Sequence, residues 1–165
     1  MNDIVEYPSV LSELICCDIL EKIDLSEPIT NIPKNNEDWN RAERLLYKTL
    51  LIYLNQYKIK TIESNPELAK NLGNKLKVEE FTIQKVTGPQ FVRKPSRKHV
   101  VSFILFLTKP EGGELKFKHA QITPEIGKLV FFPDDVEHIY TILANKGDYF
   151  AIANQISLVS NDLNL

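Results

Sequence analysis

The spacing of hydrophobic residues changes near residue 77, from a helical period of three to four residues to a strand period of two. From "LKVEEFTIQKV" onward, short apolar runs are separated by the turn segments "PEGG", "TPEIG", "PDD" and "NKGD". Helices followed by six or more short strands predict an α+β fold, in which an antiparallel double sheet is backed by N-terminal helices.

Two helices are expected in the first part of the chain. The segment "VLSELICCDILEKI" has apolar residues at helical spacing, and "SEPITNIPKNNED", with its prolines and asparagines, is predicted to be a loop. Asp38 is a candidate cap for a second, amphipathic helix of about five turns. The apolar stripe of that helix predicts core contact, and it comprises Trp39, Ala42, Leu46, Thr49, Tyr53 and Tyr57.

The strand segments differ in how much of each face is apolar. "HVVSFILFL" is apolar on both faces and is expected to be a central strand, whereas "GELKFKH" alternates and is expected to be half-exposed. Further strands are expected in "GKLVFFP", "HIYTIL" and "YFAIANQISLV". We therefore expect one domain over residues 1–165, with helical support in 1–77 and the strand core in 78–160.

Composition excludes several classes of protein. The formal charge of −2 gives no general attraction to nucleic acid or to an anionic membrane, and no apolar run is long enough to span a bilayer. The start "MNDIVEYPSV" lacks an export signal, so we expect a cytoplasmic protein, or a virion-associated one if the source is viral. Cys16 and Cys17 are adjacent, which argues against a disulfide or a cysteine zinc site.

Several motifs of the second half follow one another in a specific order. A Gly-Gly-Glu turn precedes one strand, a Pro-x-x-Gly turn precedes another, and a histidine follows, at Gly112, Gly113, Glu114, Pro124, Gly127 and His138. This order resembles the double-stranded β-helix, or jelly roll, of the 2-oxoglutarate- and Fe(II)-dependent oxygenases. The nearest branch is prolyl 4-hydroxylase-like and includes short phage-type members.

The resemblance implies a set of cofactors, a reaction and a metal ligand. Fe(II) and 2-oxoglutarate would be the cofactors, a protein or peptide side chain would be hydroxylated, and His138 would be the distal iron ligand. The branch places an Arg or Lys about ten residues beyond that histidine, to pair with the far carboxylate of 2-oxoglutarate. Here Tyr149 stands nearest to that position and Lys146 precedes it, so both are candidate cofactor-binding residues.

The sequence departs from the family at the first two iron ligands, which come as His-x-Asp ahead of the central strand. The matching stretch, "VTGPQFVRKPSRKHVVSF", lacks that motif, and no acidic residue occurs from 81 to 110. The residues in its place are cationic or apolar: Gly88 and Phe91 are followed by Arg93, Lys94 and Pro95. Because cations repel a divalent metal, we predict a degenerate iron site.

Other metal ligands remain open. His99, Asp135 and His138 form a conceivable cluster in the barrel mouth, and His119 and Asp134 are further possible donors. The segment "GKLVFFPDDVEH" also resembles the second cupin motif, with Asp135 where a glycine is usual. The first cupin motif, His-x-His with a later Glu, is missing, so a cupin-like protein is the second alternative.

The segment "RKPSRKH" carries a basic cluster of Arg93, Lys94, Arg97 and Lys98. It is either a solvated loop or a patch at the barrel mouth that faces an anion or a nucleic acid. Only Phe91 lies close by, so the aromatic residues typical of nucleic-acid binding are missing.

Two functions therefore stay open. One is an iron- and 2-oxoglutarate-dependent hydroxylase that uses His138 with irregular ligands. The other is a catalytically inactive jelly-roll module with no cofactor, such as a virion or assembly protein that binds a partner.

Overall fold

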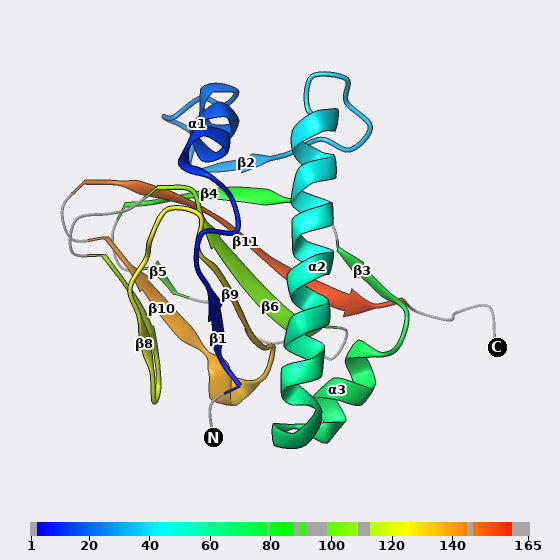
Figure 1. Cartoon of the computed structure of the whole chain (residues 1–165). Helices are drawn as coiled ribbons and strands as arrows, with labels where there is room; N and C mark the ends of the chain where they lie inside the picture. Colours follow the sequence, from blue (N-terminus) through cyan, green and yellow to red (C-terminus); the bar gives the residue numbers. More distant parts are fainter. Residues whose placement is uncertain are drawn as a thin grey trace.

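The computed structural model describes residues 3–78, 80–87, 90–91, 99–108, 113–144 and 147–159 (Figure 1). The helices are α1 (Glu13–Glu21), α2 (Asn40–Ser64), α3 (Pro66–Leu72) and the short 3-10 turn η1 (Val136–His138). The first strands are β1 (Val5–Tyr7), β2 (Ile29–Asn31), β3 (Leu76–Val78), β4 (Thr82–Val86) and β5 (Gln90–Phe91). The later strands are β6 (His99–Phe106), β7 (Glu114–Phe117), β8 (Gln121–Ile122), β9 (Leu129–Pro133), β10 (Tyr140–Leu143) and β11 (Tyr149–Leu158).

The strands form two antiparallel sheets. One has the order β1-β9-β6-β11-β4-β2, with β3 paired to β11, and the other has the order β5-β10-β7-β8. If β4 to β11 are counted from one to eight, the sheets read 6-3-8-1 and 2-7-4-5, which is the double-sheet arrangement of a jelly roll. The α+β jelly roll expected from the sequence is thus confirmed, and "HVVSFILFL" forms the central strand β6, between β9 and β11.

Helix α2 covers the outer face of the larger sheet (Figure 1). Its buried residues recur at helical spacing and meet the sheet in one core, where Tyr57 packs on Phe131 with ring centroids 5.3 Å apart. The expected apolar stripe is confirmed, and the helix is longer than expected, at 25 residues. The predicted cap was wrong: Trp39 occupies the cap position without a side-chain hydrogen bond, because Asp38 lies one residue too early.

A second core fills the space between the two sheets. It is composed of inward-facing residues of both sheets: Val86, Ile104, Phe106, Leu115, Phe117, Ile122, Val130, Phe132, Ile142, Tyr149, Ala151 and Ala153. The alternation of β6 and β11 explains this division, since successive side chains of a strand point to opposite faces. Phe103 and Leu105 face the helices, whereas Ile104 and Phe106 face the smaller sheet.

Two N-terminal strands extend the larger sheet. β1 pairs with β9, and β2 pairs with β4 at the opposite edge. β2 lies inside "SEPITNIPKNNED", so the prediction of a loop there was wrong over three residues, because sheet pairing outweighs weak local propensity. β1, β5 and β8 are also strands that the hydrophobic pattern did not indicate, since each is only two or three residues long.

Candidate functional site

The turn between β9 and β10 holds the first candidate residues. Asp135 caps η1: its Oδ1 accepts hydrogen bonds from the backbone N–H of Glu137 at 3.0 Å and of His138 at 3.1 Å. The same oxygen lies 2.6 Å from Nδ1 of His138. The His138 side chain is 17% exposed, so its ring sits partly sheltered with Nδ1 engaged and Nε2 left for another contact.

A second histidine–carboxylate pair is formed by Asp134, the residue before Asp135, and His99. Asp134 Oδ2 is 3.4 Å from Nδ1 of His99, at the start of β6, and Asp134 Oδ1 accepts a 2.8 Å hydrogen bond from the hydroxyl of Ser102. Because Asp134 lies between the serine and the histidine, this is not the serine–histidine–aspartate order of a hydrolase. The arrangement ties the end of β9 to β6.

The described residues do not fit a three-ligand iron site. Among them, no group of three or more His, Cys, Asp and Glu lies close enough to hold a metal ion. His138 is engaged by Asp135 and His99 by Asp134, while His119 is exposed in the turn after β7. In the pair of His138 and Asp135, the carboxylate orients the histidine ring by Nδ1, an arrangement that leaves Nε2 directed at any single ligand.

Tyr149 is the second candidate, and it lies in the core between the sheets. Its side chain is 0% exposed, at the first residue of β11, and packs on Phe106 with ring centroids 6.2 Å apart. In the described part of the chain, its hydroxyl is one of two buried side-chain polar atoms without a hydrogen-bond partner, and the other is Oε2 of Glu43. Desolvation, with a smaller contribution from Tyr140, raises the pKa of Tyr149, so it is a neutral hydrogen-bond donor.

A buried hydroxyl without a partner is unusual, because leaving one unpaired costs about 1–3 kcal/mol. The hydrophobic pattern alone could indicate that Tyr149 faces inward, since β11 alternates. It could not indicate which residues would surround the hydroxyl, because the core around Tyr149 is built from strands of both sheets.

Several sequence-predicted residues lie outside the described part of the chain. They are the basic cluster Arg93, Lys94, Arg97 and Lys98, the candidate Lys146, and Gly88, Pro95 and Gly112. The roles predicted for them stay predictions. Of the turn motifs, Gly113 directly precedes β7, which begins at Glu114, and Pro124 and Gly127 lie in the turn that leads into β9.

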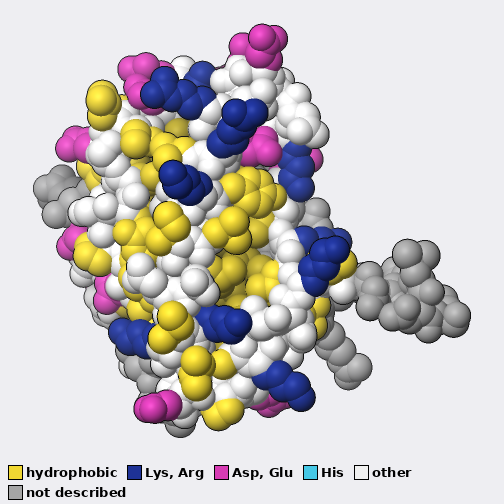
Figure 2. All heavy atoms as spheres, turned by 45° about the vertical axis from the view of Figure 1, so that its right-hand side comes forward, with side chains coloured by type: hydrophobic (Ala, Val, Ile, Leu, Met, Phe, Trp, Pro, Cys, Tyr) yellow, Lys and Arg dark blue, Asp and Glu magenta, His cyan; other side chains and the backbone are white. Residues whose placement is uncertain are grey.

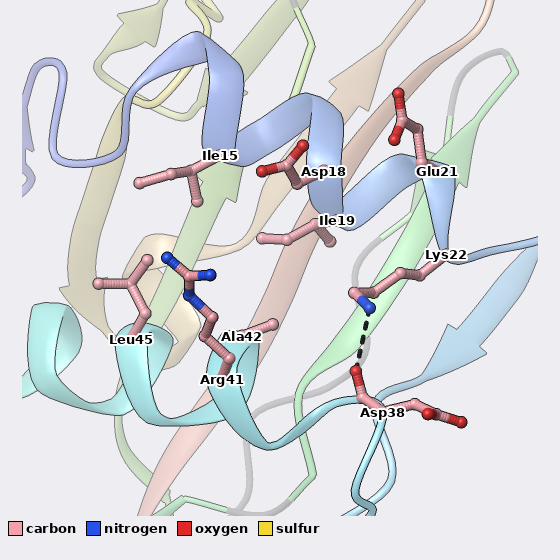
Figure 3. A pocket seen from close by; sticks show the side chains of 9 residues that line it. All are labelled: Ile15, Asp18, Ile19, Glu21, Lys22, Asp38, Arg41, Ala42 and Leu45. Carbon is pink, nitrogen blue, oxygen red and sulfur yellow. Dashed lines mark hydrogen bonds between the residues drawn. The ribbon is translucent and has the colours of Figure 1, made fainter.

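A groove of about 520 Å³ lies between α1 and α2, with side chains of both helices facing each other across it (Figure 3). Ile15, Ile19 and Leu45 supply its apolar surface. Its charged residues have both signs, Asp18, Glu21, Lys22, Asp38 and Arg41, and Nζ of Lys22 donates to the Asp38 carbonyl at 3.0 Å. This groove lacks histidines and tyrosines and has no catalytic pattern.

None of the helices in the described part of the chain combines the length and the hydrophobicity that a membrane span requires.

No family model matches the sequence, and no curated protein matches it either. Solved structures do match. One is the viral collagen prolyl hydroxylase of Paramecium Bursaria Chlorella virus-1 in complex with 2-oxoglutarate, with 17% identity and a TM-score of 0.71 over 96% of this chain and 97% of that one. The prolyl-4-hydroxylase of Pseudomonas putida matches with 13% identity and a TM-score of 0.61 over 97% and 95%.

A third match is the prolyl hydroxylase of Trichoplax adhaerens, solved with a peptide fragment of the hypoxia inducible factor oxygen degradation domain. It has 11% identity and a TM-score of 0.61, over 95% of this chain and 84% of that one. The chain therefore has the fold of the prolyl hydroxylases over nearly its whole length. At these identities the likeness establishes the fold, and the site must be argued from the residues themselves.

Proposed function

We propose that this chain is a 2-oxoglutarate oxygenase-like protein of the prolyl 4-hydroxylase type that binds a 2-oxoglutarate-like dicarboxylate but has an incomplete iron site. The observation that carries the proposal is the buried, unpartnered hydroxyl of Tyr149 in the core between the sheets. A ligand carboxylate there would accept a hydrogen bond from that hydroxyl and remove the cost of leaving it unpaired.

The position of Tyr149 in the chain supports a dicarboxylate. In the resembled family, the residue near this place at the start of the last strand pairs with the far carboxylate of 2-oxoglutarate. A neutral hydroxyl alone does not compensate for burying a charge, so a cation is needed as well. We assign that role to Lys146, three residues earlier in the chain.

Iron is the part of the family site that the described residues do not fit. His138 can offer Nε2, and Asp135 holds the ring by its other nitrogen. The sequence supplies no His-x-Asp ahead of β6 and no carboxylate from 81 to 110. Because a facial triad needs two histidines and one carboxylate, we derive no reaction step through iron for this chain.

The partner we propose is a segment of another protein. The viral, bacterial and Trichoplax proteins that share the fold are named as prolyl hydroxylases, and the last was solved with a peptide. A chain that keeps the dicarboxylate pocket and loses the iron would recognise such a segment without modifying it. The alternative function is hydroxylation of a protein side chain, which would require bound iron and would form succinate.

The first experiment measures 2-oxoglutarate binding by isothermal titration calorimetry, without iron, for the full chain and two variants. We expect Tyr149→Phe to weaken binding about tenfold, the loss of one hydrogen bond to a charged group. Tyr47→Phe is the matched control, because the Tyr47 hydroxyl donates to the Val78 carbonyl at 3.1 Å and packs in the other core. Absence of binding to the unmodified chain, or equal binding by Tyr149→Phe, would overturn the dicarboxylate site.

The second experiment measures iron content and succinate formation, using protein purified without chelators and then supplied with Fe(II), 2-oxoglutarate and air. We expect substoichiometric iron and no succinate. Stoichiometric iron that disappears in His138→Ala, together with succinate formation, would instead establish a complete iron site and an active hydroxylase. The two experiments are independent, since the first needs no metal.

A further inference from the structure

Helix α2 has a second apolar stripe on the side away from the sheet. Leu51, Ile52, Ile59 and Ile62 are 59%, 48%, 65% and 53% exposed, respectively. At helical spacing these four positions fall within roughly 100° of the helix surface, opposite the buried stripe that contains Leu46, Leu50 and Tyr57. We call these four residues the outer stripe.

Single exposed aliphatic residues are ordinary, but four on one helix face form a patch of the kind that marks an interaction site. Beside the outer stripe, a hollow of about 380 Å³ lies between α2, α3 and β3. It is lined by Leu51, Leu54, Asn55, Lys58, Leu72, Asn74 and Leu76. Four leucines and two asparagines form most of that lining, and Lys58 is its only charged residue, so the hollow offers apolar contact, amide groups and a single cation.

The surroundings of the outer stripe carry more basic than acidic residues. From the start of α2 to the end of β3, residues 40–78, the sequence has eight Lys and Arg against three Asp and Glu, whereas the whole chain has 20 against 22. Arg44, Lys48 and Lys58 belong to α2 itself, and Lys70 and Lys75 to the segment around α3. Figure 2 shows this side of the molecule, with hydrophobic side chains gathered near the centre, Lys and Arg spread among them, and most Asp and Glu toward the rim.

We propose that the outer stripe and its hollow bind an acidic, amphipathic helix of another protein. An amphipathic helix buries its apolar face in such a surface, with anchor residues every three or four positions. One anchor would enter the hollow beside Leu51 and Leu72, and a carboxylate of the partner would pair with Lys58. This surface is separate from the core between the sheets, so the inference does not depend on the proposed dicarboxylate site.

The charges and shape disfavour other occupants. A second copy would bring basic surface against basic surface in a two-fold dimer, which is repulsive. A single-stranded nucleic acid requires aromatic side chains for stacking, and the outer stripe is entirely aliphatic. A flat bilayer surface would leave the hollow unfilled. The α1–α2 groove already holds Asp18 and Glu21 opposite its own cations, so it is less suited to an acidic partner.

The test uses the full chain and a fluorescein-labelled synthetic helical peptide with leucines along one face and glutamates on the other. Fluorescence anisotropy should show binding, at least about tenfold tighter than for a matched peptide with lysine in place of every glutamate. Ile52→Ser/Ile59→Ser should weaken binding about tenfold or more, and so should Lys48→Glu/Lys58→Glu. Leu14→Ser/Leu25→Ser is the control, because these residues are 72% and 52% exposed on another part of the surface.

Four results would overturn the inference. They are absence of peptide binding, binding that the outer-stripe variants leave unchanged, equal binding of the acidic and lysine peptides, and a concentration-dependent dimer that Ile52→Ser/Ile59→Ser abolishes. Anionic phospholipid vesicles and a poly-dT oligonucleotide are run alongside; if either binds through the outer stripe and the acidic peptide does not, the partner class is wrong. Thermal melts confirm that the variants, all at exposed or half-exposed positions, remain folded.

Discussion

The Nδ1 atom of His138 lies 2.6 Å from Oδ1 of Asp135, three residues earlier in the chain. The short η1 turn creates this contact, since the same oxygen also accepts from two backbone N–H groups and caps the turn. The orientation of the histidine ring is therefore a consequence of local backbone geometry.

Asp135→Ala removes both the cap and the partner of His138. We expect a loss of about 1 kcal/mol in the free energy of unfolding, as for other cap deletions, measured by urea denaturation. Glu137→Ala is the control, because Glu137 is exposed and its carboxylate lies 3.9 Å from Lys118, so its loss should cost less than about 0.5 kcal/mol. Equal losses in the two variants would show that Asp135 contributes no more than a surface charge.

Gly127→Ala should be strongly destabilising. Gly127 has a φ of +78°, and a Cβ there would overlap the carbonyl oxygen of Leu11, so strain and overpacking together should cost roughly 2–4 kcal/mol. Gly147 has a similar φ of +73° but open space around it, so Gly147→Ala should cost only about 1–2 kcal/mol. Chemical denaturation of both variants measures the difference, and indistinguishable losses would refute the close approach of Leu11 to Gly127.

Two buried tyrosines should respond differently to removal of the hydroxyl. The Tyr57 hydroxyl donates to the Asp3 carbonyl at 2.6 Å, so Tyr57→Phe should lower the free energy of unfolding by about 1 kcal/mol. The Tyr149 hydroxyl has no partner among the described residues, so Tyr149→Phe should leave stability unchanged or raise it by about 1 kcal/mol in the absence of ligand. A clear loss of stability in Tyr149→Phe would mean that its hydroxyl is already satisfied.

Alkaline pH should destabilise the protein through the same two side chains. Burial raises the pKa of Tyr57 and of Tyr149 above the ordinary value near 10. Above that pH the unfolded chain releases protons that the folded chain retains, so the free energy of unfolding falls as pH rises. The slope approaches about 2.7 kcal/mol per pH unit for two groups.

Phenolate absorbance provides the measurement, because the chain has six tyrosines and the buried pair should titrate only as the protein unfolds. Circular dichroism recorded on the same samples should therefore change together with the last phenolate step. Titration of all six tyrosines before any loss of structure would contradict the burial of this pair.

The two cysteines should differ in reactivity. Burial, together with the neighbouring Cys17, raises the pKa of the Cys16 thiol to about 11, whereas Cys17 is exposed. Because the thiolate is the reactive form, iodoacetamide at mildly alkaline pH should modify Cys17 quickly and Cys16 only after unfolding. Mass spectrometry counts the modified thiols, and Cys17→Ser should leave the native protein nearly inert; rapid modification of that variant would refute the burial of Cys16.

The local pattern of the sequence by itself determined most of the elements and the order of the layers. The spacing of apolar residues by three to four positions predicted α2, and the run that is apolar on both faces predicted the central strand β6. Such patterns are encoded by neighbours within a few positions, so they are readable without a fold. The short strands β2, β5 and β8 were not predicted from the hydrophobic pattern. Their formation depends on the strands with which they pair, and their own residues show too little alternation.

Only the tertiary structure decided which polar groups meet. The contact of Asp134 with His99 and Ser102, and the burial of the Tyr149 hydroxyl without a hydrogen-bond partner in the described part of the chain, depend on strands that are far apart in the sequence. The physical reason is that burial and hydrogen bonding are properties of the assembled sheets, since a side chain's partners come from whichever strands pack against it.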